Sequence, residues 1–167
     1  MPSNQTPLGA LPRRFRRQRV LVVGCGDVGV RLVRQANPGV RHLALTTSPA
    51  SAAVLRSQGV CPLAGNLDQK QTLSRLAGLA HRVVYLAPPP LQGWTDPRVL
   101  SLLRALRGRS LPSQFTYVST SGVYGDCAGA WVAETQALAP TTARAHRRLD
   151  AERQVRFWGR STGVPVQ

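Results

Sequence analysis

The sequence has little acidic charge and almost no lysine. Asp and Glu number 7 among 167 residues, whereas Lys and Arg number 22, and Lys70 is the only lysine. The resulting net charge of +15 would attract nucleic acid. The preference for arginine is also the bias of a GC-rich coding sequence, however, and the arginines form only one cluster, at Arg13, Arg14, Arg16, Arg17 and Arg19. We therefore do not expect nucleic acid to be the main partner.

Cysteines are also few, and long apolar runs are absent. The sequence has three cysteines, Cys25, Cys61 and Cys127, and an odd number does not fit a disulfide framework. Their spacing is not that of metal ligands either. We therefore expect a reducing, cytoplasmic setting. No apolar run reaches 18 residues, so the sequence predicts no membrane span and no membrane partner. The arginine cluster and the apolar residues 20–23 imitate a twin-arginine export signal, but glycines interrupt the apolar run, so we do not expect export.

Length and patterning predict one α/β domain behind a basic leader. Residues 1–18 contain three prolines and no hydrophobic period, so we expect a flexible leader there and one domain over residues 19–167. The predicted strands cover residues 20–23, 40–46, 59–65, 82–87 and 114–118, and the predicted helices cover residues 28–36, 51–58, 71–79, 99–107 and 143–158. This alternation predicts a Rossmann-type, doubly wound parallel sheet with helices on both faces.

The last residues, 163–167, resemble the start of a further strand. A sheet of this kind normally continues with at least one more strand and with a region that covers the substrate. We therefore expect the chain to be a fragment or a truncated product that lacks the C-terminal substrate region.

A glycine-rich turn follows the first predicted strand. It consists of Gly24, Cys25, Gly26, Asp27, Val28 and Gly29. In a G-x-G-x-x-G turn the first glycine permits the tight turn, the second lets the backbone approach a pyrophosphate, and the third lets the helix pack closely on the strand. The N-terminus of the following helix then faces the phosphates. A glycine cluster alone would also fit an ordinary loop, but its βαβ context predicts a dinucleotide site made by these residues.

The second predicted strand ends without a carboxylate. Strand two of an NAD-binding unit usually carries an acid that binds the ribose hydroxyls, whereas this strand ends on Thr46, Thr47 and Ser48. These hydroxyls would donate hydrogen bonds to a 2′-phosphate, and Arg56 lies one short helix away. The pattern favours NADP over NAD, with Thr47 and Ser48 as cofactor-binding residues. The alternative is that Thr47 and Ser48 only cap the next helix.

Hydroxyl side chains also cluster at the end of the fifth predicted strand. Residues 117–126 read YVSTSGVYGD, at the edge where open α/β sheets bind ligands. The alternative is that these hydroxyls only end the strand and cap backbone groups. Together with the glycine turn, and with residues 65–68 and 86–88 in between, this stretch resembles the extended and atypical short-chain dehydrogenases/reductases, the NAD-dependent epimerase/dehydratase family.

The resemblance runs from about Arg19 to the C-terminus and implies further site residues. It implies that Asp68 lies near the adenine and that Leu86 and Ala87 line the cofactor. It also implies that Thr120, which takes the place of the catalytic serine or threonine of the family, hydrogen-bonds the substrate oxygen.

The sequence departs from the family at the Y-x-x-x-K element, in which tyrosine moves the proton and lysine lowers its pKa and holds the ribose. Ala143 stands at the tyrosine position and Arg147 at the lysine position. Alanine cannot carry a proton, and arginine stays protonated with a different geometry. Three interpretations stay open. Arg147 holds ribose or phosphate while Tyr124 or His146 moves the proton, or the site binds a nucleotide without turnover, or the helix only presents a solvated basic face.

Two functions from different classes follow. The first is an NAD(P)-dependent oxidoreductase of the epimerase/dehydratase type, which transfers hydride between the nicotinamide and a carbinol carbon of an unknown small-molecule substrate. Its catalytic candidates are Thr120, Tyr124 and Arg147. The second is a non-catalytic nucleotide-sensing or scaffold protein. Nucleic-acid binding by the arginine cluster is a third hypothesis, and a homodimer through the helices that flank the sheet is left open.

Overall fold

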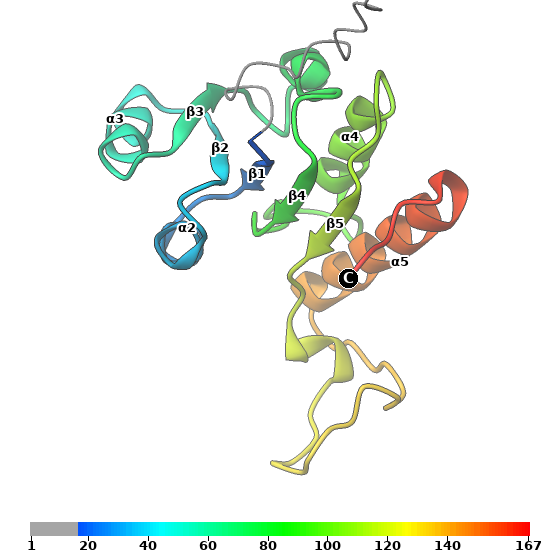
Figure 1. Ribbon diagram of the computed structural model, residues 1–167. Helices are drawn as coiled ribbons and strands as arrows, with labels where there is room; N and C mark the ends of the chain where they lie inside the picture. Colours follow the sequence, from blue (N-terminus) through cyan, green and yellow to red (C-terminus); the bar gives the residue numbers. More distant parts are fainter. Residues whose placement is uncertain (1–16) are drawn as a thin grey trace, which may run out of the picture.

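A single parallel β-sheet lies at the centre of the computed structural model, which describes residues 17–167 (Figure 1). The strands follow the order β3-β2-β1-β4-β5, and all neighbours are parallel. Their bounds are Arg19–Val23 for β1, Arg41–Thr46 for β2, Cys61–Ala64 for β3, Arg82–Tyr85 for β4 and Gln114–Tyr117 for β5. The predicted Rossmann-type α/β fold is confirmed. The predicted leader lies outside the described residues, except for its last two.

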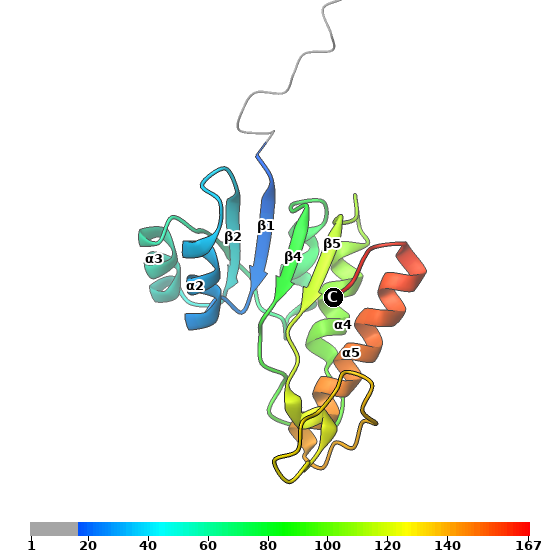
Figure 2. The same cartoon turned by 60° about the horizontal axis from the view of Figure 1, so that its bottom comes forward.

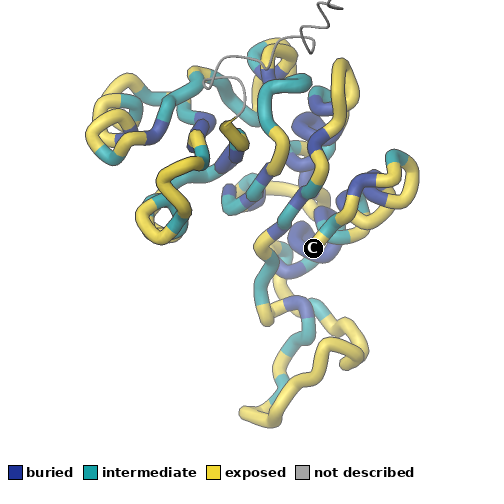
Figure 3. The backbone as a smooth tube through the Cα atoms, in the orientation of Figure 1, coloured by how far each residue is buried: buried dark blue, intermediate teal, exposed yellow. Residues whose placement is uncertain are grey.

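Helices cover both faces of the sheet (Figure 2). Their bounds are Asp27–Gln35 for α2, Pro49–Ser57 for α3, Pro97–Leu106 for α4 and Ala143–Thr162 for α5. The larger core cluster joins α4 and α5 to β1, β4 and β5, and the smaller one lies under α2 and α3. Figure 3 shows buried strands and helix faces, whereas the long segment between β5 and α5 is mostly exposed. In the part of the chain that the structure describes, no helix has the length and apolar character needed to cross a membrane.

The helix predicted over residues 71–79 forms as a 3₁₀-helix, η1, over Lys70–Leu76. Leu73 and Leu76 are three residues apart, which is the period of a 3₁₀-helix and places them on one face, whereas Leu79 follows the end of η1. Leu73 and Leu76 are fully buried against α4. The helix ends before Gly78, whose φ of +69° leaves helical space.

The end of the described chain pairs with the edge of the sheet, as its sequence predicts. Helix α5 extends to Thr162, four residues beyond its predicted end, and stops at Gly163 with a φ of +74°. Val166 then forms a parallel bridge to Phe115, and the amide of Tyr117 donates to the carbonyl oxygen of Gln167 at 2.8 Å. Another short 3₁₀-helix, η2 (Ser121–Tyr124), follows β5.

Asp96 caps α4 from a fully buried position. Its Oδ1 accepts from the amides of Arg98 at 3.0 Å and Val99 at 3.2 Å, whereas its Oδ2 has no hydrogen-bond partner among the described residues. Burial raises the pKa of this carboxyl group. The folded state therefore binds a proton more readily than the unfolded state, so this group lowers stability as the pH rises from the ordinary Asp pKa through the raised one.

We expect Asp96→Asn to keep the cap and remove this pH dependence. The stability of the variant relative to wild type should increase between pH 4 and pH 8, which urea unfolding at each pH would measure. Asp96→Ala serves as the control, because it loses the cap at every pH at a cost of about 1 kcal/mol. A stability difference between Asp96→Asn and wild type that stays constant with pH would show that Asp96 does not titrate in this way.

Candidate functional site

A cavity of about 560 Å³ opens at the carboxyl ends of β1, β2, β3 and β4. It lies where the strand order reverses between β1 and β4, which is the position at which open α/β sheets bind ligands. Its volume falls within the range of roughly 300–1,000 Å³ that ligand pockets occupy. Of the predicted cofactor-binding residues, those that line it are Gly24, Cys25, Gly26, Asp27, Val28, Thr47, Asp68, Leu86 and Ala87.

The three glycines of the turn have different surroundings. Gly24 has a φ of +86°, and a Cβ there would lie 2.4 Å from the amide nitrogen of Ala87. At Gly26 a Cβ would meet nothing within 4 Å, so this residue borders open space. Gly29 does not line the cavity, because it packs into the fold, where a Cβ would lie 3.2 Å from Val22 Cγ1. These are the surroundings that the three roles of a dinucleotide-binding turn require.

The N-terminus of α2 borders the cavity without a side-chain cap. Gly26 is the N-cap residue, and the first helical residue, Asp27, forms an exposed ion pair of 2.9 Å with Arg31. The thiol of Cys25 packs toward Gly29 and the core under α3, and burial raises its pKa. The thiol is therefore protonated at neutral pH. The turn therefore offers no ionised thiol at neutral pH, and the end of α2 that borders the cavity is the end at which a helix has free backbone N–H groups.

The hydroxyls at the end of β2 divide between two roles. Thr47 lines the cavity. Ser48 is absent from the lining and caps α3, accepting from the amide of Ser51 at 3.2 Å. Arg56, farther along α3, is exposed and does not line the cavity either. For Ser48 the structure therefore matches the alternative that the sequence left open, a helix cap.

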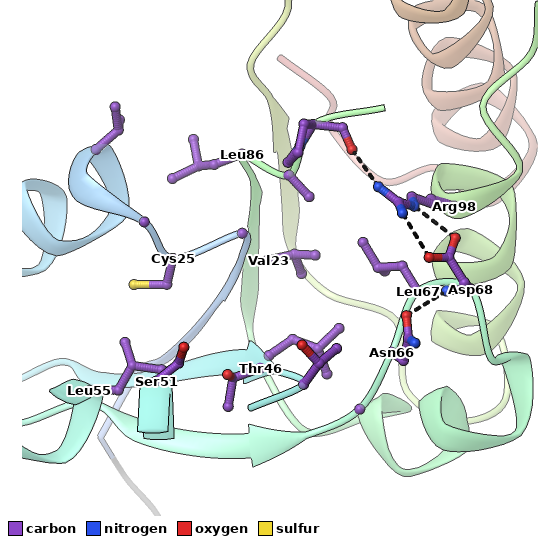
Figure 4. Close-up of a pocket in the computed structure, with 18 of the residues that line it drawn as sticks. Val23, Cys25, Thr46, Ser51, Leu55, Asn66, Leu67, Asp68, Leu86 and Arg98 are labelled. Atoms are coloured by element: carbon purple, nitrogen blue, oxygen red, sulfur yellow. Dashed lines mark hydrogen bonds and ion pairs between the residues drawn. The ribbon is translucent and has the colours of Figure 1, made fainter. Parts of the chain in front are cut away.

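Asp68 and Arg98 form an ion pair at one end of the cavity (Figure 4). Arg98 Nε donates to Oδ1 of Asp68 at 2.8 Å, and its NH2 donates to Oδ2 at 2.7 Å. Arg98 NH1 also donates to the carbonyl oxygen of Pro88 at 3.3 Å. Hydrogen bonding to Arg98 lowers the pKa of Asp68. Arg98 is not among the site residues that the sequence predicts, although it stands in the first turn of a helix that follows the end of a strand.

The structure does not bring the predicted catalytic residues to this cavity. Thr120 caps η2, accepting from the amide of Gly122 at 3.3 Å. Tyr124 borders a different cavity of about 660 Å³, together with Glu152. Arg147 is buried, and its NH1 donates to the carbonyl oxygen of Gly93 at 2.6 Å. These three residues therefore have separate environments, and none of them lines the cavity at the glycine turn.

The next residue along α5, Arg148, holds the ends of β4 and β5 together. It is buried, and its NH1 donates to the hydroxyl of Tyr117 at 3.0 Å and to the carbonyl oxygens of Val118 at 3.2 Å and Ala87 at 3.3 Å. Its guanidinium also lies 5.6 Å from the centre of the Tyr117 ring. Because Ala87 lines the cavity, Arg148 supports the cavity wall from behind.

Comparison with known proteins gives structural matches only. No family model and no curated protein matches the chain. The chain superposes on UDP-glucuronic acid 4-epimerase from Bacillus cereus in complex with UDP-glucuronic acid and NAD, with a TM-score of 0.72 and 21% identity over 89% of this chain and 55% of the other. It also matches a dTDP-glucose 4,6-dehydratase from Streptomyces venezuelae with bound NAD (TM-score 0.74, 21% identity, 89% and 54% covered).

A third match extends the same pattern. UDP-glucose 4-epimerase from Thermotoga maritima, with UDP-glucose, gives a TM-score of 0.74 at 17% identity, with 89% of this chain and 53% of the other covered. The chain thus spans about half the length of the epimerases and dehydratases that it matches. Over that half, this chain has the Rossmann-type α/β fold of NAD-dependent epimerase/dehydratase structures, the extended short-chain dehydrogenases/reductases.

Proposed function

We propose that this chain binds NAD or NADP in the cavity at the glycine turn. The observation that carries the proposal is the open space at Gly26, next to the uncapped N-terminus of α2. A pyrophosphate there would accept hydrogen bonds from the first N–H groups of α2 and would meet the positive end of the helix dipole. The adenosine ribose would then lie at the end of β2, near Thr47, and the base beyond it.

The choice between NAD and NADP depends on the hydroxyls at the end of β2. Thr47 is available to a 2′-phosphate, but Ser48 caps α3 and Arg56 lies outside the cavity lining. Two of the matched structures contain NAD. The case for NADP is thus weaker than the sequence indicated, and both cofactors belong in the binding experiment.

We propose further that this chain binds the dinucleotide without catalysing hydride transfer by itself. Ala143 offers no proton, and Arg147 is engaged with the carbonyl oxygen of Gly93. The second candidate function, an oxidoreductase or epimerase, would need Thr120 and Tyr124 to act together on a substrate. Its substrate class would be a nucleotide sugar, by analogy with the epimerases named above. The cytoplasm is the proposed setting for either function.

Titration with NADH and NADPH tests the proposal, with energy transfer from tryptophan to the reduced nicotinamide as the signal. Gly26→Asp should weaken binding at least tenfold, or about 1.4 kcal/mol. The new side chain would extend into open space, so the fold should persist, while its carboxylate would repel the pyrophosphate. Gly108→Asp adds the same charge at an exposed site after α4, where a Cβ would make only ordinary contacts, and should bind like wild type. Absence of binding by the folded wild-type chain would contradict the proposal.

A further inference from the structure

The Arg98–Asp68 ion pair forms one end wall of the cavity. Figure 4 shows Arg98 and Asp68 on one side of the cavity and Cys25 of the glycine turn on the other. Three segments meet in this wall, because Asp68 follows β3, Arg98 lies in the first turn of α4, and Pro88 follows β4. The backbone amide of Asp68 also donates to Asn66 Oδ1 at 3.0 Å, which restrains the backbone of the segment that follows β3.

The ion pair retains hydrogen-bonding capacity. A guanidinium carries five N–H groups, and three of these serve the bonds to Asp68 and Pro88. Each Asp68 oxygen accepts one bond from Arg98 and keeps a further lone pair. The exposed fractions of the two side chains are 25% for Arg98 and 51% for Asp68, so a ligand can reach both. The wall therefore presents donors and acceptors side by side.

The ligand group that meets this wall follows from the order of groups in a dinucleotide, and this step rests on the proposed function. The pyrophosphate would lie at the glycine turn, and the adenosine ribose at the end of β2. The same cavity is lined by Thr47, Gly65 and Leu67 and by the ion pair itself. The group attached to that ribose is the base. The base is therefore the part of the ligand that would reach Arg98 and Asp68.

We propose that Arg98, together with Asp68, forms hydrogen bonds with the base and makes the site selective for adenine. Adenine carries an amino group, which donates, next to ring nitrogens, which accept. Asp68 would accept from the amino group, and Arg98 would donate to the neighbouring ring nitrogen. The resemblance noted above implies only that Asp68 lies near the adenine. Arg98 is the additional specificity-determining residue that the structure assigns.

The charge of Arg98 supports this role. It holds the pKa of Asp68 below its ordinary value, so Asp68 stays an acceptor throughout the neutral pH range. Because the bidentate contact holds the two side chains together, they cannot exchange places to suit another base. Hypoxanthine, which has a carbonyl oxygen and a ring N–H at the corresponding positions, would direct its oxygen at Asp68 and its N–H at Arg98.

Three ligands separate base recognition from the rest of binding. They are NADH, the reduced nicotinamide hypoxanthine dinucleotide, and reduced nicotinamide mononucleotide, which has no purine. The wild-type chain should bind NADH at least tenfold more tightly than the hypoxanthine dinucleotide. In Arg98→Leu this ratio should fall below threefold, with NADH affinity reduced about tenfold and affinity for the mononucleotide unchanged. Arg104→Leu, on an exposed residue of the same helix, should keep the wild-type ratio.

Asp68→Asn tests the other partner of the ion pair. Asparagine can donate to the carbonyl oxygen of hypoxanthine, so the variant should lose the preference for adenine while the mononucleotide binds as before. If Arg98→Leu does not fold, Arg98→Lys is measured in its place. Lysine keeps the positive charge but lacks the planar guanidinium, so the ratio of NADH affinity to hypoxanthine dinucleotide affinity should again fall.

The outcomes distinguish this inference from the proposed function. Failure of the folded wild-type chain to bind NADH would overturn both. Binding of NADH that is lost in Gly26→Asp, combined with an adenine preference that Arg98→Leu and Arg98→Lys leave unchanged, would overturn the role of Arg98 alone. A ratio near one in the wild-type chain would likewise overturn base selection while leaving dinucleotide binding intact.

Discussion

Replacing Gly24 by alanine is expected to lower the free energy of unfolding by about 3 kcal/mol, because two costs add. The φ of +86° at this position is unfavourable for a residue with a Cβ. The Cβ would also lie 2.4 Å from the nitrogen and 2.5 Å from the Cα of Ala87. These are backbone atoms, so no side-chain rotation relieves the clash, and β1 and β4 would have to separate at the cavity.

The matched control is Gly26→Ala, two residues further along the same turn. Its φ is −84°, and its Cβ would meet nothing within 4 Å, so we expect a change in stability below about 1 kcal/mol. Urea unfolding followed by circular dichroism measures both variants. Equal losses at Gly24 and Gly26 would mean that close packing of the turn against Ala87 is not what makes glycine necessary at Gly24.

Arg148→Met is expected to cost about 3 kcal/mol in unfolding free energy. Methionine fills a similar volume but donates no hydrogen bond. The change therefore leaves the carbonyl oxygens of Ala87 and Val118 and the hydroxyl of Tyr117 without this buried donor. Arg148 also lowers the pKa of the buried Asp96, so the variant should lose further stability as the pH rises.

The control for Arg148 is an exposed arginine on the same helix. Arg153→Met should change the unfolding free energy by less than about 0.5 kcal/mol, because this side chain is exposed. Urea unfolding of both variants at pH 6 and pH 8 measures the effect. If Arg148→Met is as stable as Arg153→Met, the bonds from Arg148 to the strand ends contribute little to the fold.

The glycine turn shows how much of the candidate site can be predicted from sequence. A strand, three spaced glycines and an amphipathic helix are local patterns, and local backbone preferences decide where they form. Gly24 and Gly26 therefore border the cavity as the motif predicts. The role of Ser48 does not follow from sequence alone, because the same hydroxyl can donate to a phosphate or cap a helix. The structure shows the cap at 3.2 Å.

Local pattern was insufficient where two kinds of helix compete. The leucines of residues 71–79 satisfy an amphipathic α-helix and a 3₁₀-helix equally well at single-turn length. The segment forms the tighter 3₁₀ geometry of η1, and it packs against α4, which lies about thirty residues farther along the chain. Tertiary packing can thus override the more common helical geometry.

The sequence by itself determined the succession of strands and helices along the chain and the position of the glycine turn, because each of these depends on neighbours within a few residues. Only the tertiary structure decided which charged side chains meet. Arg98 and Asp68 are thirty residues apart in the chain and come together because β3 and α4 end and begin at the same edge of the sheet. Arg147 and Arg148 are adjacent, yet one holds Gly93 and the other holds the ends of β4 and β5. Neighbouring residues on a helix point about 100° apart, so packing of the whole helix, not the local sequence, sets their partners.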